Sequence, residues 1–321
     1  MDQPRAAGAA TLRVSVTDRC NLRCAYCMPQ AGVPLVPRVE IPSLSELAGA
    51  VRWLVERFAV DRVKVTGGEP LVRGGLPAFV SAVAAIPGVR EVSMTTNGTR
   101  LAASARELAE AGLLRVNVSL DTLEPGRFRE LTRGGRVAEA LEGIDAALAA
   151  GLTPLKLNSV LRRSSFREDV PALLAFAAEK GVEVRFIELM QTGTEAAWAI
   201  AERVAGAGVR EWLVSEGARV TPLPDRPNAP ARRAAVEWNG RSVATGWIDP
   251  VSHAFCGDCD RLRLDARGRL RRCLMDDQAF PLVDLLRRGE ADVAAAASIY
   301  VGGKRPPDEM TIGSAMASIG G

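Results

Sequence analysis

The sequence lacks any apolar run near the roughly 18 residues that a membrane-spanning helix needs. Its first residues, Met1-Asp2-Gln3-Pro4, include an acid and no apolar stretch, so we expect no secretory signal. The net charge is only +3, from 41 Lys and Arg against 38 Asp and Glu, which is too balanced for a nucleic-acid-binding surface. No Gly-x4-Gly-Lys-Ser/Thr motif occurs, which excludes a P-loop nucleotide site. These absences predict a cytoplasmic protein that binds neither membrane nor nucleic acid.

Strand-like and helix-like segments alternate along the first two thirds of the 321 residues. Strands are predicted at Leu12–Val16, Val63–Thr66, Val92–Thr95, Val116–Leu120, Leu155–Val160 and Val184–Leu189. Amphipathic stretches between them predict helices at Ser45–Phe58, Leu101–Glu110, Val137–Ala150 and Val170–Lys180. A capping-box pattern at Ser43–Glu46 precedes the first helix. The alternation predicts an α/β fold with parallel strands, as an open sheet or a barrel.

The pattern changes near residue 220, where we place a boundary between domains 1–220 and 221–321. Thr221–Pro230 contains four prolines and is predicted to be a linker or extended loop. A hairpin over 235–248, turning at Asn239-Gly240, and a second hairpin over 261–274 follow. The second part is therefore predicted to be a smaller α+β domain.

All six cysteines fall into two groups of three: Cys20, Cys24 and Cys27, then Cys256, Cys259 and Cys273. A large chain without an export signal is expected in a reducing compartment, which disfavours disulfides and favours metal sites. In the first group, C-x3-C-x2-C offers three thiolates, which on a [4Fe–4S] cluster leave one iron open for another ligand. The second group has two alternatives on spacing alone, because His253 could complete a Cys3His zinc site in place of a second cluster.

Cations interrupt strands that would otherwise be continuously apolar, at Arg13, Arg62, Lys64, Lys156 and Arg185. A cation inside a parallel sheet is costly unless an anion meets it. Glu69, Asp121 or Glu188 could pair with any one of them, but some of the five are expected to face a polyanion. Both Arg and Lys bind phosphate, so a phosphorylated ligand is predicted. Polar or glycine-bearing segments follow five of the strands, and the carboxyl ends of parallel strands form a ligand-binding edge.

Several motifs resemble a known family. C-x3-C-x2-C at a strand end, followed by Gly67-Gly68-Glu69-Pro70, resembles the radical S-adenosylmethionine (SAM) enzymes. Residues 12–21, residues 255–264, Cys273-Leu274 and the terminal Gly320-Gly321 are similar to the GTP 3′,8-cyclases that begin molybdenum cofactor biosynthesis. The resemblance implies an incomplete (β/α)6 TIM-like barrel and a C-terminal domain that carries an auxiliary cluster. It also implies a lyase that converts GTP to (8S)-3′,8-cyclo-7,8-dihydroguanosine 5′-triphosphate.

The resemblance implies roles for individual residues as well. Cys20, Cys24 and Cys27 would bind a [4Fe–4S] cluster whose open iron chelates SAM. Cys256, Cys259 and Cys273 would bind a second [4Fe–4S] cluster whose open iron meets the guanine, without His253. SAM would contact Tyr26, Gly68, Ser119 and Met190. GTP would contact Arg13, Lys64, Thr95, Lys156, Arg261 and Arg263, with Arg62 and Arg185 nearby. Catalytic roles would fall to Arg13, Lys64, Arg261, Arg263, Gly320 and Gly321.

The implied partners are GTP, an external one-electron donor and a downstream enzyme that forms the pyranopterin, and a homodimer is a possible assembly. Asp260 departs from the family, which often has Asn there; it could weaken phosphate or guanine contacts, or pair with Arg261. One alternative function is a radical SAM enzyme that modifies a peptide or protein, against which the strand cations argue. Another is a non-enzymatic iron–sulfur or zinc protein, in which Gly67-Gly68-Glu69-Pro70 would have no purpose.

Overall fold

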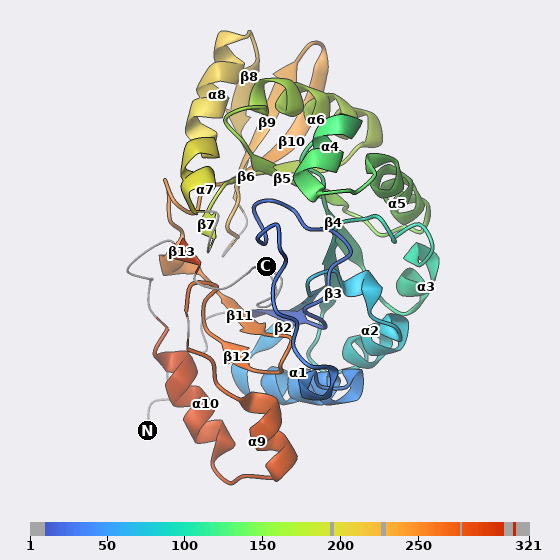
Figure 1. Cartoon of the computed structure of the whole chain (residues 1–321), viewed down its shortest axis with the longest axis vertical. Coiled ribbons are helices and arrows are strands. Elements are labelled where there is room, and N and C mark those ends of the chain that lie inside the picture. Colours follow the sequence, from blue (N-terminus) through green and yellow to red (C-terminus); the bar gives the residue numbers. More distant parts are fainter. Residues whose placement is uncertain (1–9, 193–195, 226–228, 277, 305–310, 313–321) are drawn as a thin grey trace.

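The computed structural model describes residues 10–192, 196–225, 229–276, 278–304 and 311–312. One curved sheet of eleven strands runs through them, in the order β12-β11-β1-β2-β3-β4-β5-β6-β10-β9-β8. Figure 1 shows this sheet curving around the centre of the view, with helices α1 to α6 on its outer side. The sheet does not close on itself in the described residues, so the fold is the predicted incomplete α/β barrel.

Six parallel strands, adjacent in chain order, form the middle of the sheet. They are β1 (Ala10–Ser15), β2 (Val60–Thr66), β3 (Glu91–Thr96), β4 (Arg115–Ser119), β5 (Lys156–Leu161) and β6 (Glu183–Glu188). Each matches a predicted strand, with ends shifted by a few residues. Alternation along β1 buries Leu12 and Val14 completely in the core beneath the helices, and leaves Arg13 on the inner face.

Helices cover the outer face of these strands. They are α1 (Leu44–Phe58), α2 (Leu76–Ala84), α3 (Ala105–Glu110), α4 (Pro125–Thr132), α5 (Val137–Ala149) and α6 (Phe166–Lys180). The predicted capping box is confirmed: Glu46 N donates to Ser43 Oγ at 3.2 Å, and Ser43 N donates to Glu46 Oε2 at 2.7 Å. The helix α6 ends at Gly181, whose φ of 66° suits glycine.

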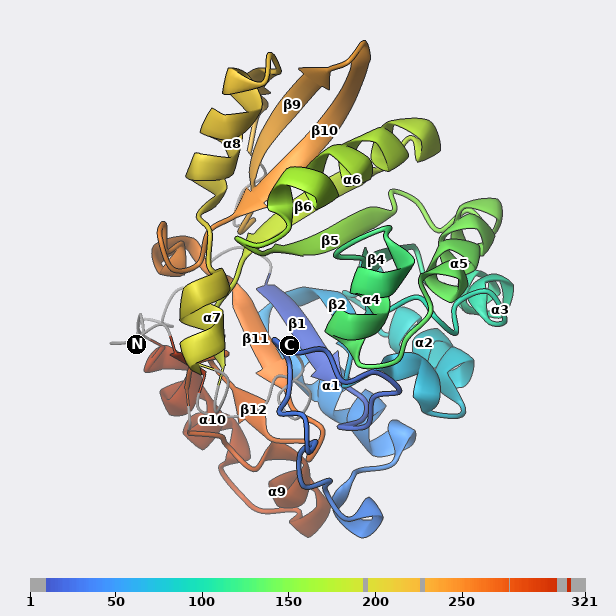
Figure 2. The ribbon, with the colours of Figure 1, turned by 45° about the horizontal axis from the view of Figure 1, so that its top comes forward.

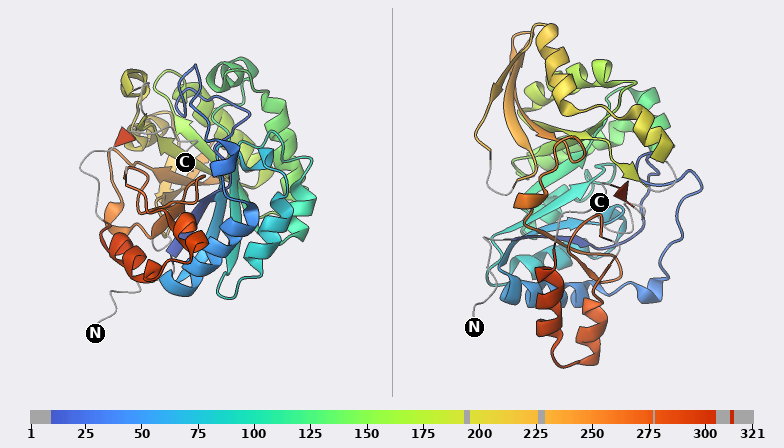
Figure 3. Two further views of the ribbon diagram at one scale, coloured as in Figure 1. Left: turned by 60° about the horizontal axis from the view of Figure 1, so that its bottom comes forward. Right: turned by 90° about the vertical axis from the view of Figure 1, so that its left-hand side faces the viewer.

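The remainder of the chain adds elements at both ends of the molecule (Figure 3). The helices are α7 (Ala196–Glu202), α8 (Gly206–Ser215), α9 (Leu282–Arg288) and α10 (Val293–Gly302). The strands are β8 (Arg219–Pro222), β9 (Arg232–Trp238), β10 (Arg241–Ile248), β11 (Arg261–Leu264) and β12 (Leu270–Arg271). A separate pair joins β7 (Gln191–Thr192) to β13 (Thr311–Ile312). The helix α9 packs against both α1 and α10 (Figure 2).

Strands from the last third of the chain extend the sheet at both edges. β10 lies parallel to β6, and β11 lies parallel to β1. The hairpin turn at Asn239-Gly240 is confirmed, with φ values of 49° and 72°. The linker predicted over Thr221–Pro230 is wrong at its start, because Thr221 and Pro222 belong to β8; this is the outermost strand, where proline is tolerated. The second hairpin is shorter than predicted and ends at Arg271.

The predicted boundary at residue 220 stays a prediction, and the sheet continues across it without interruption. Within the described residues, no helix is both long and apolar enough to cross a membrane.

Candidate active site

The inner face of the sheet encloses a cavity of about 430 Å³. Its walls come from β1 to β6, from β11 and from the segment that links β10 to β11. The predicted convergence of strand ends is seen in Thr95, Ser119, Asp121 and Met190, which all line it. All six predicted GTP contacts also line this one cavity: Arg13, Lys64, Thr95, Lys156, Arg261 and Arg263.

A row of cations crosses the inner face. Strand register places Arg13 of β1 between Arg263 of β11 and Lys64 of β2. The same row continues through Ser93 of β3 to Arg115 of β4. Neighbouring strands lie about 4.8 Å apart, so these like charges are held close together. Such an arrangement favours an anionic ligand with several charges.

The electrostatics of the row show the repulsion of like charges. Removal from water, then the charges of Arg115, Arg13 and Arg185, hold the pKa of Lys64 well below its usual value. Removal from water and the charge of Arg261 lower the pKa of Arg13 to about 10. No ion pair forms at the Lys64 ammonium among the described residues. A bound polyanion would relieve this repulsion.

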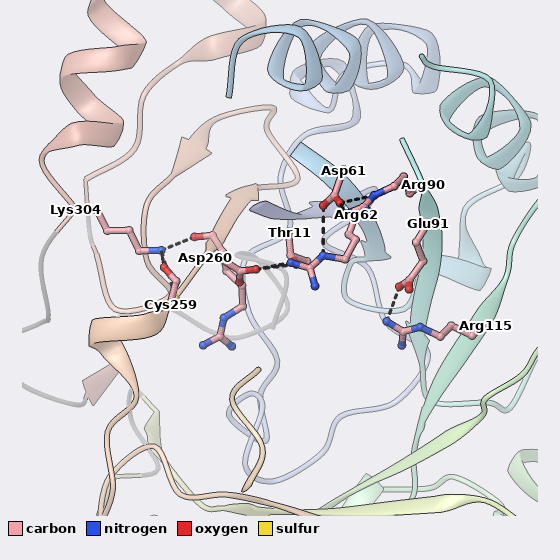
Figure 4. Close-up of polar contacts among 10 residues, drawn as sticks. Thr11, Asp61, Arg62, Arg90, Glu91, Arg115, Cys259, Asp260 and Lys304 are labelled. Carbon is pink, nitrogen blue, oxygen red and sulfur yellow. Dashed lines mark hydrogen bonds and ion pairs between the residues drawn. The ribbon is translucent and has the colours of Figure 1, made fainter. Parts of the chain in front are cut away.

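Three of the strand cations pair with carboxylates that the sequence did not single out as their partners. Arg62 donates to Asp260 Oδ2 at 2.7 Å and lies 3.4 Å from Asp61 (Figure 4). Glu183 accepts from Arg185 Nε at 2.7 Å and lies 3.6 Å from Lys156 Nζ. Asp260 therefore pairs with Arg62 on β2. Its pairing with Arg261, one of the two alternatives that the sequence left open, is not seen among the described residues.

The three carboxylates predicted as partners bind other groups in this structure. Glu69 accepts from Thr96 Oγ1 and Asn97 N, both at 2.7 Å, and burial raises its pKa to about 6. Asp121 accepts from Tyr26 Oη at 2.8 Å and Val160 N at 2.7 Å, and burial raises its pKa to about 6 as well.

Glu188 accepts the N–H groups of Val251 and Ser252 at 2.9 and 2.8 Å. It thereby ties the end of β6 to the segment that leads from β10 toward the second cysteine group. These contacts show why the carboxylates are buried: they organise loops at the cavity edge.

The first cysteine group lies in one loop that follows β1. Arg23 N and Ala25 N donate to the carbonyls of Thr132 and Leu131 at 3.1 and 2.9 Å. Cys27 N donates to Cys24 O at 2.9 Å, which folds the loop back on itself. Burial, then the charges of Cys27, Asp121 and Cys20, raise the pKa of Cys24 well above its usual value.

Gly67 and Gly68 form the floor beneath this loop. Gly68 N donates to Thr17 O at 2.7 Å, and a Cβ on Gly68 would lie closer than 3.0 Å to the Arg19 carbonyl oxygen. Only glycine allows the two backbones to approach so closely. Of the predicted SAM contacts, Tyr26, Ser119 and Met190 line the cavity, whereas Gly68 does not. Gly68 lies against Asp18 and Arg19, at the start of the cysteine loop, and its contact with SAM stays a prediction.

The second cysteine group lies on two segments at the cavity wall. Cys256 begins a short 3-10 helix (Cys256–Asp258), Cys259 follows that helix, and Cys273 comes after β12. Burial, then the charges of Cys273 and Cys259, raise the pKa of Cys256. Burial alone would raise the pKa of Cys259, but the charges of Arg261 and Lys304 outweigh it and lower that pKa. His253 is exposed, and its backbone N–H donates to Asp249 O at 2.9 Å.

Each group presents three cysteines that form no disulfide, and three thiolates suit iron–sulfur ligation. Across the described ranges, no set of three His, Cys, Asp or Glu side chains is arranged to hold a metal ion. Two polar atoms at the cavity have no hydrogen-bond partner within the described part of the chain. They are Thr95 Oγ1 and Asn158 Oδ1, and both are buried. A polar ligand would satisfy both. Gly320 and Gly321 lie outside the described residues.

Sequence reasoning missed several residues at the cavity. Arg115, Asn117 and Asn158 line it, Lys304 contacts the second cysteine group, and Arg272 anchors the segment that carries Cys273. For Arg115 a signal was present, since Arg115, Asn117 and Ser119 alternate along β4 with the period of a strand. For Lys304 no local pattern indicates its long-range contacts.

Comparison with known proteins gives the class first. The model of the Radical SAM superfamily matches residues 14–177, and that of Molybdenum Cofactor Synthesis C matches residues 182–309. The crystal structure of Streptococcus suis SuiB bound to S-adenosylmethionine shares the fold, with a TM-score of 0.64 and 14% identity over 92% of this chain and 68% of that chain. Fold and cysteine loop therefore define a radical SAM enzyme, a class that uses SAM and a [4Fe–4S] cluster.

Curated relatives narrow the class. The GTP 3′,8-cyclase of Pelotomaculum thermopropionicum is 44% identical over 304 residues, 92% of this chain and 91% of that protein. The GTP 3′,8-cyclase of Moorella thermoacetica is 43% identical over 321 residues, 97% of each protein. The chain belongs to the GTP 3′,8-cyclase family. The resemblance drawn from the sequence is confirmed, and the relatives support it over the peptide-modifying and non-enzymatic alternatives.

Proposed function

We propose that this enzyme binds GTP in the cavity and joins C3′ of the ribose to C8 of the guanine. The product is (8S)-3′,8-cyclo-7,8-dihydroguanosine 5′-triphosphate, and the reaction is the first step of molybdopterin synthesis. The observation that carries the proposal is the row Arg263–Arg13–Lys64, which offers adjacent cations to a triphosphate inside an enclosed site. The names of the relatives support the same substrate.

The two cysteine groups would have different tasks. Cys20, Cys24 and Cys27 would hold a [4Fe–4S] cluster, with SAM beside Tyr26, Ser119 and Met190. When bound there, this cluster together with SAM would supply the radical chemistry that removes a hydrogen atom from C3′ of the ribose. Cys256, Cys259 and Cys273 would hold a second [4Fe–4S] cluster at the guanine end of the cavity. Three thiolates alone would suit zinc as well as an iron–sulfur cluster. The exposed position of His253, the fourth ligand that the spacing offered to zinc, supports the cluster.

The chain's own side chains bind and orient the substrate. Arg13, Lys64 and Arg263 neutralise the triphosphate, while Arg261 approaches from the same strand as Arg263. Thr95 and Asn158 give the ligand the hydrogen bonds that their buried oxygen atoms lack among the described residues. Enclosure by the sheet limits access of water to a reactive carbon centre. Catalytic roles for Gly320 and Gly321 remain part of the proposal.

The proposal includes three partners beyond GTP. An external one-electron donor would reduce the first cluster, a downstream enzyme would form the pyranopterin from the product, and a second copy of the chain could complete a homodimer. We further propose that the enzyme acts in the cytoplasm and that its core barrel and C-terminal domain meet near residue 220.

The test is an anaerobic assay of the iron- and sulfide-reconstituted enzyme with dithionite and SAM. The amount of 5′-deoxyadenosine is measured with GTP, with guanosine and with neither. We expect a clear rise with GTP and none with guanosine, because only GTP engages the cation row. SAM cleavage that ignores GTP would favour a peptide substrate, and bound iron without any SAM cleavage would contradict the radical SAM assignment.

A further inference from the structure

Lys304, just after α10, contacts the second cysteine group directly. Its ammonium nitrogen lies 2.9 Å from Cys259 O, 2.7 Å from Arg261 O and 3.3 Å from Cys259 Sγ (Figure 4). A lysine ammonium has three N–H donors, and these three acceptors match them in number. All three acceptors belong to the segment that carries Cys259 into β11. Lys304 therefore binds one of the two segments that carry the second cysteine group.

The end of α10 also binds the other segment, which carries Cys273. Arg272 precedes Cys273, and its Nη1 donates to the carbonyl oxygens of Gly303 at 2.9 Å and Tyr300 at 3.4 Å. The Arg272 guanidinium lies 4.6 Å from the centre of the Tyr300 ring. Residues 300–304 thus bind both of the segments that carry these cysteines. The two segments also pair as strands β11 and β12, but that pairing involves residues 263–264 and 270–271 and does not include the cysteines. Residues 300–304 thereby link the segment that carries Cys259 to the segment that carries Cys273.

An ordinary helix-terminal lysine would interact with the last carbonyls of its own helix. Lys304 donates instead to carbonyls and a sulfur atom more than forty residues earlier in the chain. A positive charge or hydrogen bond at a cysteine sulfur stabilises the reduced, more negative form of an iron–sulfur cluster. This contact therefore affects a cluster held by Cys259 in two ways, through geometry and through charge.

We propose that Lys304 is a positioning residue for the second iron–sulfur cluster. Lys304 orients Cys259 as a ligand of that cluster and raises the reduction potential of the cluster. The inference rests on the second cluster of the proposed function. It assigns to the end of α10 a role in the site, beyond that of packing against α9.

The test uses the full chain with Cys24→Ser, which disables the first cluster site so that iron signals report the second. Lys304→Met and Lys304→Arg are compared in this background for cluster iron, for its rate of loss to a chelator and for midpoint potential by EPR-monitored titration. For Lys304→Met we expect several-fold faster iron loss and a more negative potential. Lys304→Arg, which keeps the positive charge, should have a midpoint potential close to that of the Cys24→Ser parent. Lys180→Met, at an exposed pair with Asp145, is the matched control and should change nothing.

Three outcomes separate the claims. An unchanged potential and iron-loss rate in Lys304→Met would overturn the role of Lys304 while leaving the second cluster intact. Loss of iron with an unchanged potential in the remaining cluster would overturn the electrostatic part. If the Cys24→Ser parent binds no iron at all, the second cluster of the proposed function fails, and the inference fails with it.

Discussion

The two cysteine groups are held by different kinds of contact. The first lies in one short loop, fixed by backbone hydrogen bonds to residues 131–132 and by the close approach of Gly68. The second spans two segments and is fixed by the side chains of Lys304 and Arg272. A loop held by backbone groups depends little on which side chains surround it. A site held by side chains can be altered by a single substitution, so variation between relatives should act mainly on the second group.

Cys256→Ala should have the largest effect, because it disables the second cysteine group and leaves the first intact. Conversion of GTP should be abolished because the second cluster loses a ligand, while SAM binding stays unchanged. SAM affinity by equilibrium dialysis and product by chromatography measure the two effects. Cys24→Ala is the control and should abolish both. Equal loss of SAM binding in Cys256→Ala would contradict separate roles for the two groups.

Gly68→Ala attacks the backbone support of the first group. The added Cβ would lie closer than 3.0 Å to the Arg19 carbonyl oxygen, and the shift needed costs about 1–3 kcal/mol. If that cost falls on the cysteine loop, SAM binding weakens by roughly 5- to 150-fold. Gly74→Ala is the matched control, because nothing lies within 4 Å of a Cβ there. Equal SAM affinities in the two variants would show that the loop does not need this close approach.

Lys64→Met tests the cation row of the cavity, and the two effects expected of it have opposite signs. Lys64 is half-buried beside Arg13 and Arg115 and forms no ion pair within the described residues, so its removal should raise the melting temperature of the ligand-free enzyme. The KM for GTP should rise about tenfold, because one charge-assisted phosphate contact is lost. A lower melting temperature together with an unchanged KM would place the phosphates elsewhere.

Asp260→Asn should have the smallest effect and tests the side-chain network near the second group. Its carboxylate binds Arg62, so the neutral amide should release that cation toward the cavity. We expect the KM for GTP to fall by about threefold, in keeping with a partly exposed ion pair worth under about 1 kcal/mol. Steady-state kinetics would show this, with Asp61→Asn as the comparison on the outer side of Arg62. A higher KM would show that Asp260 itself supports the substrate.

The sequence predicts the core of this fold well because its signals are local. Alternation places Arg13 and Lys64 on the inner face, and the Ser43–Glu46 box and Gly181 mark helix ends. The partners of the buried charges are not predictable in this way. Asp260 meets Arg62 across 198 residues of sequence, and nothing near either residue indicates that pairing.

The same limit applies to the outer strands and the second cysteine group. Thr221 and Pro222 are in a strand although the surrounding prolines indicate a loop, since an edge strand needs only one neighbour. Lys304 reaches Cys259 across 45 residues, from a segment without a recognisable motif. Contacts of this kind depend on tertiary packing, which local spacing does not encode.

The pairing of β1 with β11 has a consequence for protein synthesis. Thr11 lies opposite Arg261, so one edge of the first strand has no partner until most of the chain has left the ribosome. During that interval the nascent chain carries an exposed edge that can pair with other strands. A translation product truncated before β11 would keep this edge open and would hold Arg13 and Lys64 without Arg263. Synthesis through β11 is therefore required both to protect the first strand and to finish the phosphate-facing row.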